Sequence, residues 1–174
     1  MARTGNTRRM SPLGTLHLLL VDDNANMRAI VATMLRSIGI GRLSEAEDGA
    51  QALAILREHP IDIAIVDFRM QPMDGVAFTR SIRGEEHSPN PYLPIVMMTG
   101  HSERSRVTEA RDAGVNEFVA KPVMINALMK RLEAIIMRPR TFVRSDDFFG
   151  PDRRRTHRLD HEGPFRRATD LQQA

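Results

Sequence analysis

The sequence contains no cysteine and only two lysines, Lys121 and Lys130, among its 174 residues. Without cysteine, disulfide bonds, thiol chemistry and thiolate metal sites are excluded, which agrees with a cytoplasmic setting. No run of about eighteen apolar residues is present, so a membrane-spanning helix is not expected. The first apolar stretch, residues 16–21, is too short for a signal peptide and leads directly into two aspartates. We therefore expect a soluble, cytoplasmic protein without a membrane partner.

Positive charge is concentrated at the two ends of the chain. Residues 1–14 carry three arginines and no acid, and residues 138–174 carry nine arginines and six acids, so each end has a net charge of +3. The whole chain also has a net charge of +3, which leaves residues 15–137 at −3. We expect a disordered basic N-terminus at 1–14, one folded domain at 15–137 and an arginine-rich tail at 138–174.

Two kinds of segment alternate within the expected domain. Apolar runs that end in polar residues predict strands at 17–23, 42–46, 61–68, 94–100 and 116–120. Apolar spacing and helix-ending residues predict helices at about 27–38, 49–59, 76–83, 103–113 and 125–136, of which the fourth rests on a cap and on Gly114. Asn24, Asp48 and Ser102 can cap the first, second and fourth of these helices. Five strand–helix pairs predict an α/β fold with a parallel sheet covered by helices on both faces.

The tail has a different pattern. Periodicity stops at Arg138, and a segment rich in arginine, aspartate, glycine and proline is expected to be disordered in isolation. It nevertheless holds a near repeat, GPDRRR at 150–155 and GPFRR at 163–167, and the first copy follows Phe148 and Phe149. Two interpretations stay open: a docking segment, for a partner or for the domain itself, or a linker.

Polar side chains occur where four of the predicted strands end. Asp22 and Asp23 end the first strand, Asp67 the third, Thr99 the fourth and Lys121 the fifth. Each has an ordinary explanation when taken alone, such as a turn, a loop or a solvated charge. Ligands of open parallel sheets bind beyond the carboxyl ends of the strands, where all five residues are expected to meet. Their joint occurrence in strand order therefore favours a site.

This set of residue types suits phosphoryl chemistry. Two carboxylates about 4 Å apart repel each other by roughly 4 kcal/mol at an effective dielectric constant near 20, so three of them need positive charge nearby. Lys121 supplies one charge, and a site of hard oxygen ligands suits Mg²⁺. A screened Asp67 carboxylate can attack phosphorus, while Lys121 and Thr99 stabilise the charge on the phosphoryl oxygens.

Four blocks of sequence resemble a known family. VDDN (21–24), IAIVDFRMQPMDG (63–75), PIVMMTGHSE (94–103) and DAGVNEFVAKP (112–122) are similar to the motifs of the receiver domain of two-component response regulators, the fold of the chemotaxis regulators. The resemblance covers residues 15–137 and implies a doubly wound, flavodoxin-like five-stranded parallel sheet with strand order 2-1-3-4-5. It also implies a phosphorelay function, with a histidine kinase or a phosphotransfer protein as the phosphoryl donor.

The resemblance assigns roles to the site residues. Asp67 is then the phosphoacceptor, and Mg²⁺ is bound by Asp22, Asp23 and Asp67 together with the backbone carbonyl of Arg69. Such a protein is a switch and not an enzyme, apart from its own phosphorylation and dephosphorylation.

The resemblance also implies a switching mechanism. Thr99 is the switch hydroxyl, Lys121 binds the phosphoryl group, and Phe118 is the switch aromatic residue. Phosphorylation would change the surface formed by the fourth helix, the fifth strand and the fifth helix, where a downstream protein partner binds. The poor apolar face of the helix at 103–113 fits such a partner surface. Whether the protein also forms a homodimer is left open by the sequence.

The sequence departs from the family pattern in the loop after Asp67. Gln71 is inserted, so Pro72 comes one residue later than is common, although Asp74-Gly75 keeps its distance from Asp67. Arg69 and His101 occupy positions that in this family influence the rate of phosphoryl loss. Arg69 either shields the phosphoryl group or faces solvent, and the sequence does not distinguish the two.

The sequence favours three other functions less. A haloacid dehalogenase-type phosphatase needs a second aspartate two residues after the nucleophile, and here that residue is Arg69, which cannot accept a proton. A nucleotide-binding enzyme is weaker still, because neither GxxxxGK[ST] nor GxGxxG occurs. A nucleic-acid-binding regulator acting through the basic tail is not favoured either, since residues 138–174 are too few for a helix-turn-helix domain and six acids dilute the arginines.

Overall fold

The computed structural model describes residues 12–84, 88–100, 105–145 and 147–153. Five strands form one sheet with the order β2-β1-β3-β4-β5, and every adjacent pair is parallel. The strands are β1 (His17–Val21), β2 (Arg42–Ala46), β3 (Ile63–Asp67), β4 (Ile95–Thr99) and β5 (Glu117–Ala120). The predicted fold class and strand order are confirmed.

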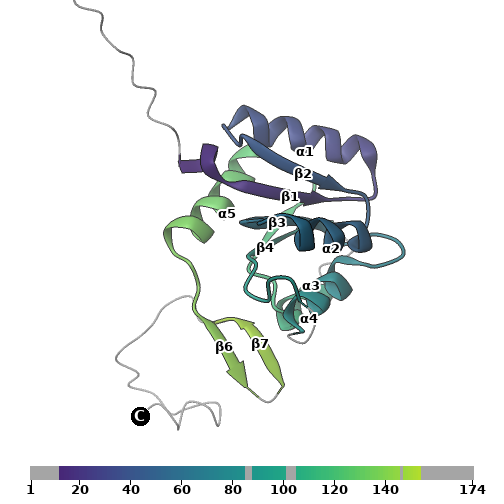
Figure 1. Ribbon diagram of the computed structural model, residues 1–174, viewed down its shortest axis with the longest axis vertical. Coiled ribbons are helices and arrows are strands. Elements are labelled where there is room, and N and C mark those ends of the chain that lie inside the picture. The colour runs from purple at the N-terminus through teal and green to yellow at the C-terminus, as the bar shows by residue number, and fades with distance from the viewer. Residues whose placement is uncertain (1–11, 85–87, 101–104, 146, 154–174) are drawn as a thin grey trace, which may run out of the picture.

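Helices cover both faces of the sheet (Figure 1). Core residues of α1 and α5 pack with one face of the sheet, and core residues of α2, α3 and α4 pack with the other. The helices are α1 (Ala25–Ser37), α2 (Gly49–Glu58), α3 (Gly75–Arg83), α4 (Val107–Ala113) and α5 (Ile125–Met137). Among the described residues, no helix combines the length and apolar character needed to cross a membrane.

The central strands are apolar on both sides, because both faces of the sheet are covered. In β3, Ala64 and Val66 pack toward α2, α3 and α4, whereas Ile63 and Ile65 pack toward α1 and α5. This alternation follows from the two-residue repeat of a strand. Each fully buried aliphatic side chain of this kind contributes about 1.5–3 kcal/mol to folding. The buried strands thereby hold the residues at their ends in fixed positions.

Two predicted helix caps are confirmed. The Asn24 side chain accepts hydrogen bonds from the backbone N–H groups of Asn26 and Met27, and the Asp48 side chain accepts one from Gln51. The third differs: α4 begins at Val107, and the predicted cap Ser102 lies outside the described residues.

The structure differs from expectation at both ends of the domain. Pro12–Thr15 forms a short 3-10 helix, and the tail forms an antiparallel hairpin of β6 (Phe142–Ser145) and β7 (Phe148–Pro151), which extends beyond α5 (Figure 1). The physical reason for the hairpin is aromatic packing, since Phe142 and Phe149 both contact Tyr92. Residues 1–11 and 154–174, including the second copy of the near repeat, lie outside the described residues.

Candidate functional site

The structure brings the acidic residues at the strand ends together. Asp22 and Asp23 directly follow β1, and Asp67 is the last residue of the adjacent strand β3. One carboxylate oxygen from each of the three lies within 4.8 Å of the others. These three residues therefore meet at the carboxyl ends of the strands, as predicted, and their oxygens are close enough together to share one cation.

Asp22 is the most deeply buried member of this cluster. Its side chain is fully buried, and its Oδ1 accepts a 2.8 Å hydrogen bond from the backbone N–H of Asn24. Its Oδ2 accepts no hydrogen bond from any described residue, and the Lys121 Nζ lies 3.6 Å away. A buried carboxylate oxygen without a hydrogen-bond partner is costly. A metal ion would satisfy it, so these residues fit a divalent cation.

Asp67 is bound more directly by the lysine. The Lys121 Nζ lies 2.8 Å from Asp67 Oδ1. Burial nevertheless raises the pKa of Asp67, Lys121 opposes that rise, and the neighbouring Asp22 carboxylate adds to it. A single ammonium group therefore does not fully compensate the buried negative charge of this cluster.

Asp23 is exposed and contacts the loop in which the sequence departs from the family pattern. Its Oδ2 accepts a 3.3 Å hydrogen bond from the backbone N–H of Gln71, the inserted residue. The insertion thus ties the loop after β3 to the acidic pair after β1. The side chain of Arg69, in the same loop, is exposed.

Asp74 and Gly75 hold the other end of this loop close to Asp67. The Asp74 side chain caps α3 by accepting a 2.8 Å hydrogen bond from the backbone N–H of Ala77. A Cβ atom at Gly75 would collide with the backbone carbonyl oxygen of Asp67. Glycine at this position therefore allows the start of α3 to pack directly against the end of β3.

Thr99 lies on β4, the strand next to that of Asp67, and Phe118 lies on β5, one strand further out. Asp67 pairs with Met98, so the buried Thr99 is one residue further along the adjacent strand β4. The Thr99 carbonyl accepts a 2.7 Å hydrogen bond from the Lys121 backbone N–H, which fixes the lysine beside it. Phe118 is half-buried and packs with the core on the side of α2, α3 and α4. His101 lies outside the described residues.

Sequence reasoning missed Arg106, which links α4 to the loop after β3. Its guanidinium group forms ion pairs with Asp74, at 3.3 Å, and with Glu109, at 2.9 Å, and lies 5.0 Å from the centre of the Phe68 ring. The three-residue spacing to Glu109 could have indicated that pair. The contacts with Asp74 and Phe68 had no sequence signal, because they join segments about thirty residues or more apart.

Comparison with known proteins agrees with this geometry. The chain matches the family described as response regulator receiver domain over residues 18–133. It is 35% identical over 123 residues to the chemotaxis protein CheY-3 of Vibrio cholerae, which covers 71% of this chain and 93% of that protein. It is also 35% identical to the chemotaxis protein CheY of Pseudomonas aeruginosa, with 71% and 98% covered.

Solved structures show the same similarity. The receiver domain of sensor histidine kinase PA1611 from Pseudomonas aeruginosa, described with a magnesium ion coordinated in the active site cleft, superposes with a TM-score of 0.63 at 30% identity. That match covers 70% of this chain and 98% of that one. The chemotaxis protein CheY4 of Vibrio cholerae superposes with a TM-score of 0.63 at 28% identity and covers 69% and 98%.

These similarities distinguish between the functions considered from the sequence. Neither an aspartate-nucleophile phosphatase nor a nucleic-acid-binding regulator is favoured by them. The family match spans more than half of the chain and contains all the strand-end residues described above. The chain therefore belongs to the response regulator receiver domain family and functions in two-component signalling.

Proposed function

We propose that this protein is a cytoplasmic phosphoacceptor switch in which Asp67 receives a phosphoryl group from a histidine kinase or a phosphotransfer protein. The observation that carries the proposal is the placement of Asp67 within the carboxylate cluster, with the Lys121 ammonium group 2.8 Å from its Oδ1. The protein catalyses at most its own phosphorylation and dephosphorylation, so it is not an enzyme in the ordinary sense.

Mg²⁺ is the cation proposed for the cluster. The carboxylates of Asp22, Asp23 and Asp67 are close enough to share the ion. The family resemblance adds the backbone carbonyl of Arg69, and all four donors are hard oxygen atoms that suit a small divalent ion. The buried Asp22 Oδ2, which lacks a hydrogen-bond partner among the described residues, supports this choice. When bound, Mg²⁺ neutralises negative charge on the phosphoryl oxygens.

The residues of the chain then have distinct tasks in the transfer. A carboxylate oxygen of Asp67 attacks the phosphorus atom, and the bond from phosphorus to the donor's imidazole nitrogen breaks with its electron pair left on nitrogen. The Lys121 ammonium group, already in contact with Asp67, binds one phosphoryl oxygen, and the Thr99 hydroxyl donates a hydrogen bond to another. The product is an aspartyl phosphate.

The same contacts make the site a switch. A phosphoryl group adds about −1.5 to −2 charges and three acceptor oxygens, which attract Thr99 and Lys121. Inward movement of Thr99 vacates space beside β4, into which the half-buried Phe118 can turn. This changes the surface of α4, β5 and α5 for a downstream protein. Converting roughly a 1:99 mixture of two such states into a 99:1 mixture requires roughly 5.5 kcal/mol of differential stabilisation.

Intact mass measurement with a small phosphodonor tests the proposal. The full chain is incubated with Mg²⁺ and acetyl phosphate, and the wild type is compared with Asp67→Asn and with Asp112→Asn. Asp112 lies on α4 and outside the carboxylate cluster, so it is a matched control. We expect the wild type and Asp112→Asn to gain the mass of one phosphoryl group and Asp67→Asn to gain none.

Two results would contradict the proposal. Equal labelling of Asp67→Asn and the wild type would place the modification elsewhere. Labelling of the wild type at the same rate with EDTA in place of Mg²⁺ would contradict the role of the metal. Circular dichroism spectra of the three proteins must agree, so that loss of labelling is not loss of the fold.

A further inference from the structure

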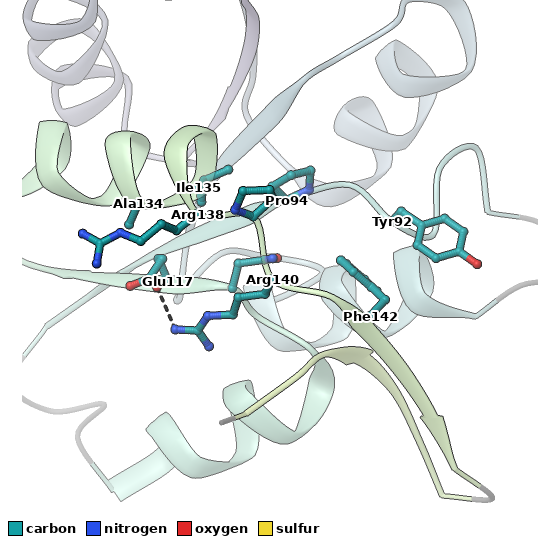
Figure 2. A pocket seen from close by; sticks show the side chains of 10 residues that line it. Tyr92, Pro94, Glu117, Ala134, Ile135, Arg138, Arg140 and Phe142 are labelled. Atoms are coloured by element: carbon teal, nitrogen blue, oxygen red, sulfur yellow. Dashed lines mark hydrogen bonds and ion pairs between the residues drawn. The ribbon is translucent and has the colours of Figure 1, made fainter. Parts of the chain in front are cut away.

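A second charged site lies at the start of β5, the end of that strand away from Lys121. Glu117, the first residue of β5, is buried, and its carboxylate lies 3.3 Å from Arg131 of α5 and 2.8 Å from Arg140 of the tail. Figure 2 shows Arg140 reaching Glu117 from the segment that follows α5. The start of the tail is thereby held against the domain.

The hairpin forms a wall beside this ion pair. The Phe142 ring lies 5.2 Å from the Tyr92 ring and 5.0 Å from the Arg83 guanidinium carbon. In the other strand of the hairpin, β7, Gly150 packs against the backbone of Gly114, and an added Cβ at Gly150 would lie 3.0 Å from the Cα of Gly114. Phe142 and Gly150 lie beyond residue 133, where the family match ends, so this wall is an addition to the receiver domain.

A cavity of about 210 Å³ lies between α5, the start of β4 and the hairpin (Figure 2). Most of its lining is apolar: Tyr92, Pro94, Ala134, Ile135, Pro139 and Phe142. Pockets for small molecules and cofactors usually measure about 300–1,000 Å³. The cavity is smaller than these and suits one large apolar side chain.

A more open groove of about 750 Å³ adjoins the cavity and shares Glu117, Ala134, Arg138 and Arg140 with it. Four basic residues and two acidic ones line the groove, and Glu117 already binds two of the bases. The other two bases, Lys130 and Arg138, are exposed and form no ion pair within the described part of the chain. The groove therefore has positive charge available for a partner.

We propose that the cavity and groove together bind an acidic peptide segment of a partner protein, which inserts one aromatic or large aliphatic side chain into the cavity. Charge complementarity supports this occupant, since Lys130 and Arg138 flank an apolar surface that includes Met137, which is 75% exposed. The chain's own residues 154–174 fit poorly, because they carry five arginines and only three acids. The site begins at the first residue of β5, at the end away from Lys121, and neither its lining nor its test requires phosphorylation of Asp67, so the proposal stands without the proposed function.

Peptide selection tests the proposal. A phage library of random twelve-residue peptides is selected on the immobilised full chain, and the most enriched peptide is labelled for fluorescence anisotropy. We expect enriched peptides to share one aromatic or large aliphatic residue flanked by aspartate or glutamate. Their affinity should fall as salt is added, because the flanking contacts are electrostatic.

Two variants locate the bound peptide. Ala134→Phe places a ring in the cavity from a half-buried position on α5, and we expect roughly thirtyfold weaker binding, as for a central interface residue. Arg138→Glu reverses one exposed charge of the groove, and we expect about tenfold weaker binding. Arg57→Glu makes the same charge change on the exposed surface of α2 and should leave the affinity unchanged. If Ala134→Phe fails to fold, the comparison of Arg138→Glu with Arg57→Glu carries the test.

Several outcomes would overturn the proposal. These are failure to enrich any peptide, enrichment of peptides without acidic residues, and equal binding by the wild type, Ala134→Phe and Arg138→Glu. Sedimentation of the wild type as a dimer and of Ala134→Phe as a monomer would assign the groove to a second copy of the chain. Tighter binding of a single-stranded DNA oligonucleotide than of the selected peptide, lost in Arg138→Glu, would assign it to nucleic acid.

Discussion

At one end of β5 the Lys121 ammonium group lies between the carboxylates of Asp22 and Asp67, whereas at the other end the Glu117 carboxylate lies between the guanidinium groups of Arg131 and Arg140. The first end has an excess of buried negative charge, and the second has basic groups left over. The difference indicates what each end can bind: a cation and a phosphoryl group at the first, and an acidic partner at the second.

The buried charged groups Asp22 and Arg83, one at each end, also differ in how far their polar atoms are satisfied. Asp22 Oδ2 lacks a hydrogen-bond partner among the described residues. The buried Arg83 near the hairpin instead donates hydrogen bonds to the backbone carbonyls of Pro91, Leu93 and Gly114 and to Asn116 Oδ1. Burial lowers the pKa of Arg83 to about 10, so it remains charged at neutral pH. Arg83 is therefore a structural support, whereas Asp22 is available to a ligand.

Replacing Arg83 should have the largest effect and would show how far the hairpin end depends on this support. In Arg83→Met, the buried carbonyls of Leu93 and Gly114 and the partly buried carbonyl of Pro91 lose this donor, so we expect the free energy of unfolding to fall by about 3–5 kcal/mol. Urea denaturation measures it. Arg80→Met, one turn away with a 60% exposed side chain paired only at the surface, should cost less than about 1 kcal/mol. Equal losses would mean that Arg83 is not the main support of this end.

Removing one carboxylate from the other end should have the next largest effect. Asp23→Asn deletes a charged ligand of the proposed metal site without disturbing the core, since Asp23 is exposed. We expect Mg²⁺ affinity, measured by isothermal titration calorimetry, to fall by about 100-fold. Glu58→Gln removes the same charge from the exposed surface of α2 and serves as the control. An unchanged Mg²⁺ affinity in Asp23→Asn would contradict the assignment of a cation site to this end of the sheet.

Truncating Phe142 should loosen the hairpin without affecting the carboxylate cluster. The ring contacts Tyr92, Phe149 and Arg83, so in Phe142→Ala we expect hydrogen exchange in β6 and β7 to become about thirtyfold faster, equivalent to about 2 kcal/mol. Val143→Ala changes the neighbouring, exposed side chain and should have little effect. If Mg²⁺ affinity also fell in Phe142→Ala, the two ends of the sheet would not be independent.

The smallest effect concerns Asp67 and pH. Because burial raises its pKa, the folded metal-free protein holds the Asp67 proton more tightly than the unfolded chain does. Ionising Asp67 as pH rises therefore lowers the stability of the fold. With EDTA present, Asp67→Asn should be more stable than the wild type at about pH 7, and the difference should shrink toward about pH 4. Urea denaturation across this range measures it, and a difference that grows on acidification would contradict the assigned pKa shift.

Part of the site could be predicted from the sequence because it depends on regular elements. Asp22, Asp67, Thr99 and Lys121 each stand where an apolar strand ends, and parallel strands place their carboxyl ends together. The hairpin could not be predicted in this way. Its strands have four residues each, and Phe142 and Phe149 are held by Tyr92, a residue about fifty positions earlier in the chain.

The sequence by itself determined the alternation of strands and helices, the caps at Asn24 and Asp48, and which residues reach the carboxyl edge of the sheet, because these follow from local spacing. Only the tertiary structure decided that Asp22 Oδ2 lacks a hydrogen-bond partner among the described residues, and that Arg140 and Phe142 bring the tail against β5 and Arg83. Burial and contacts between distant segments are properties of the packed chain, and neither is encoded in the spacing of neighbouring residues.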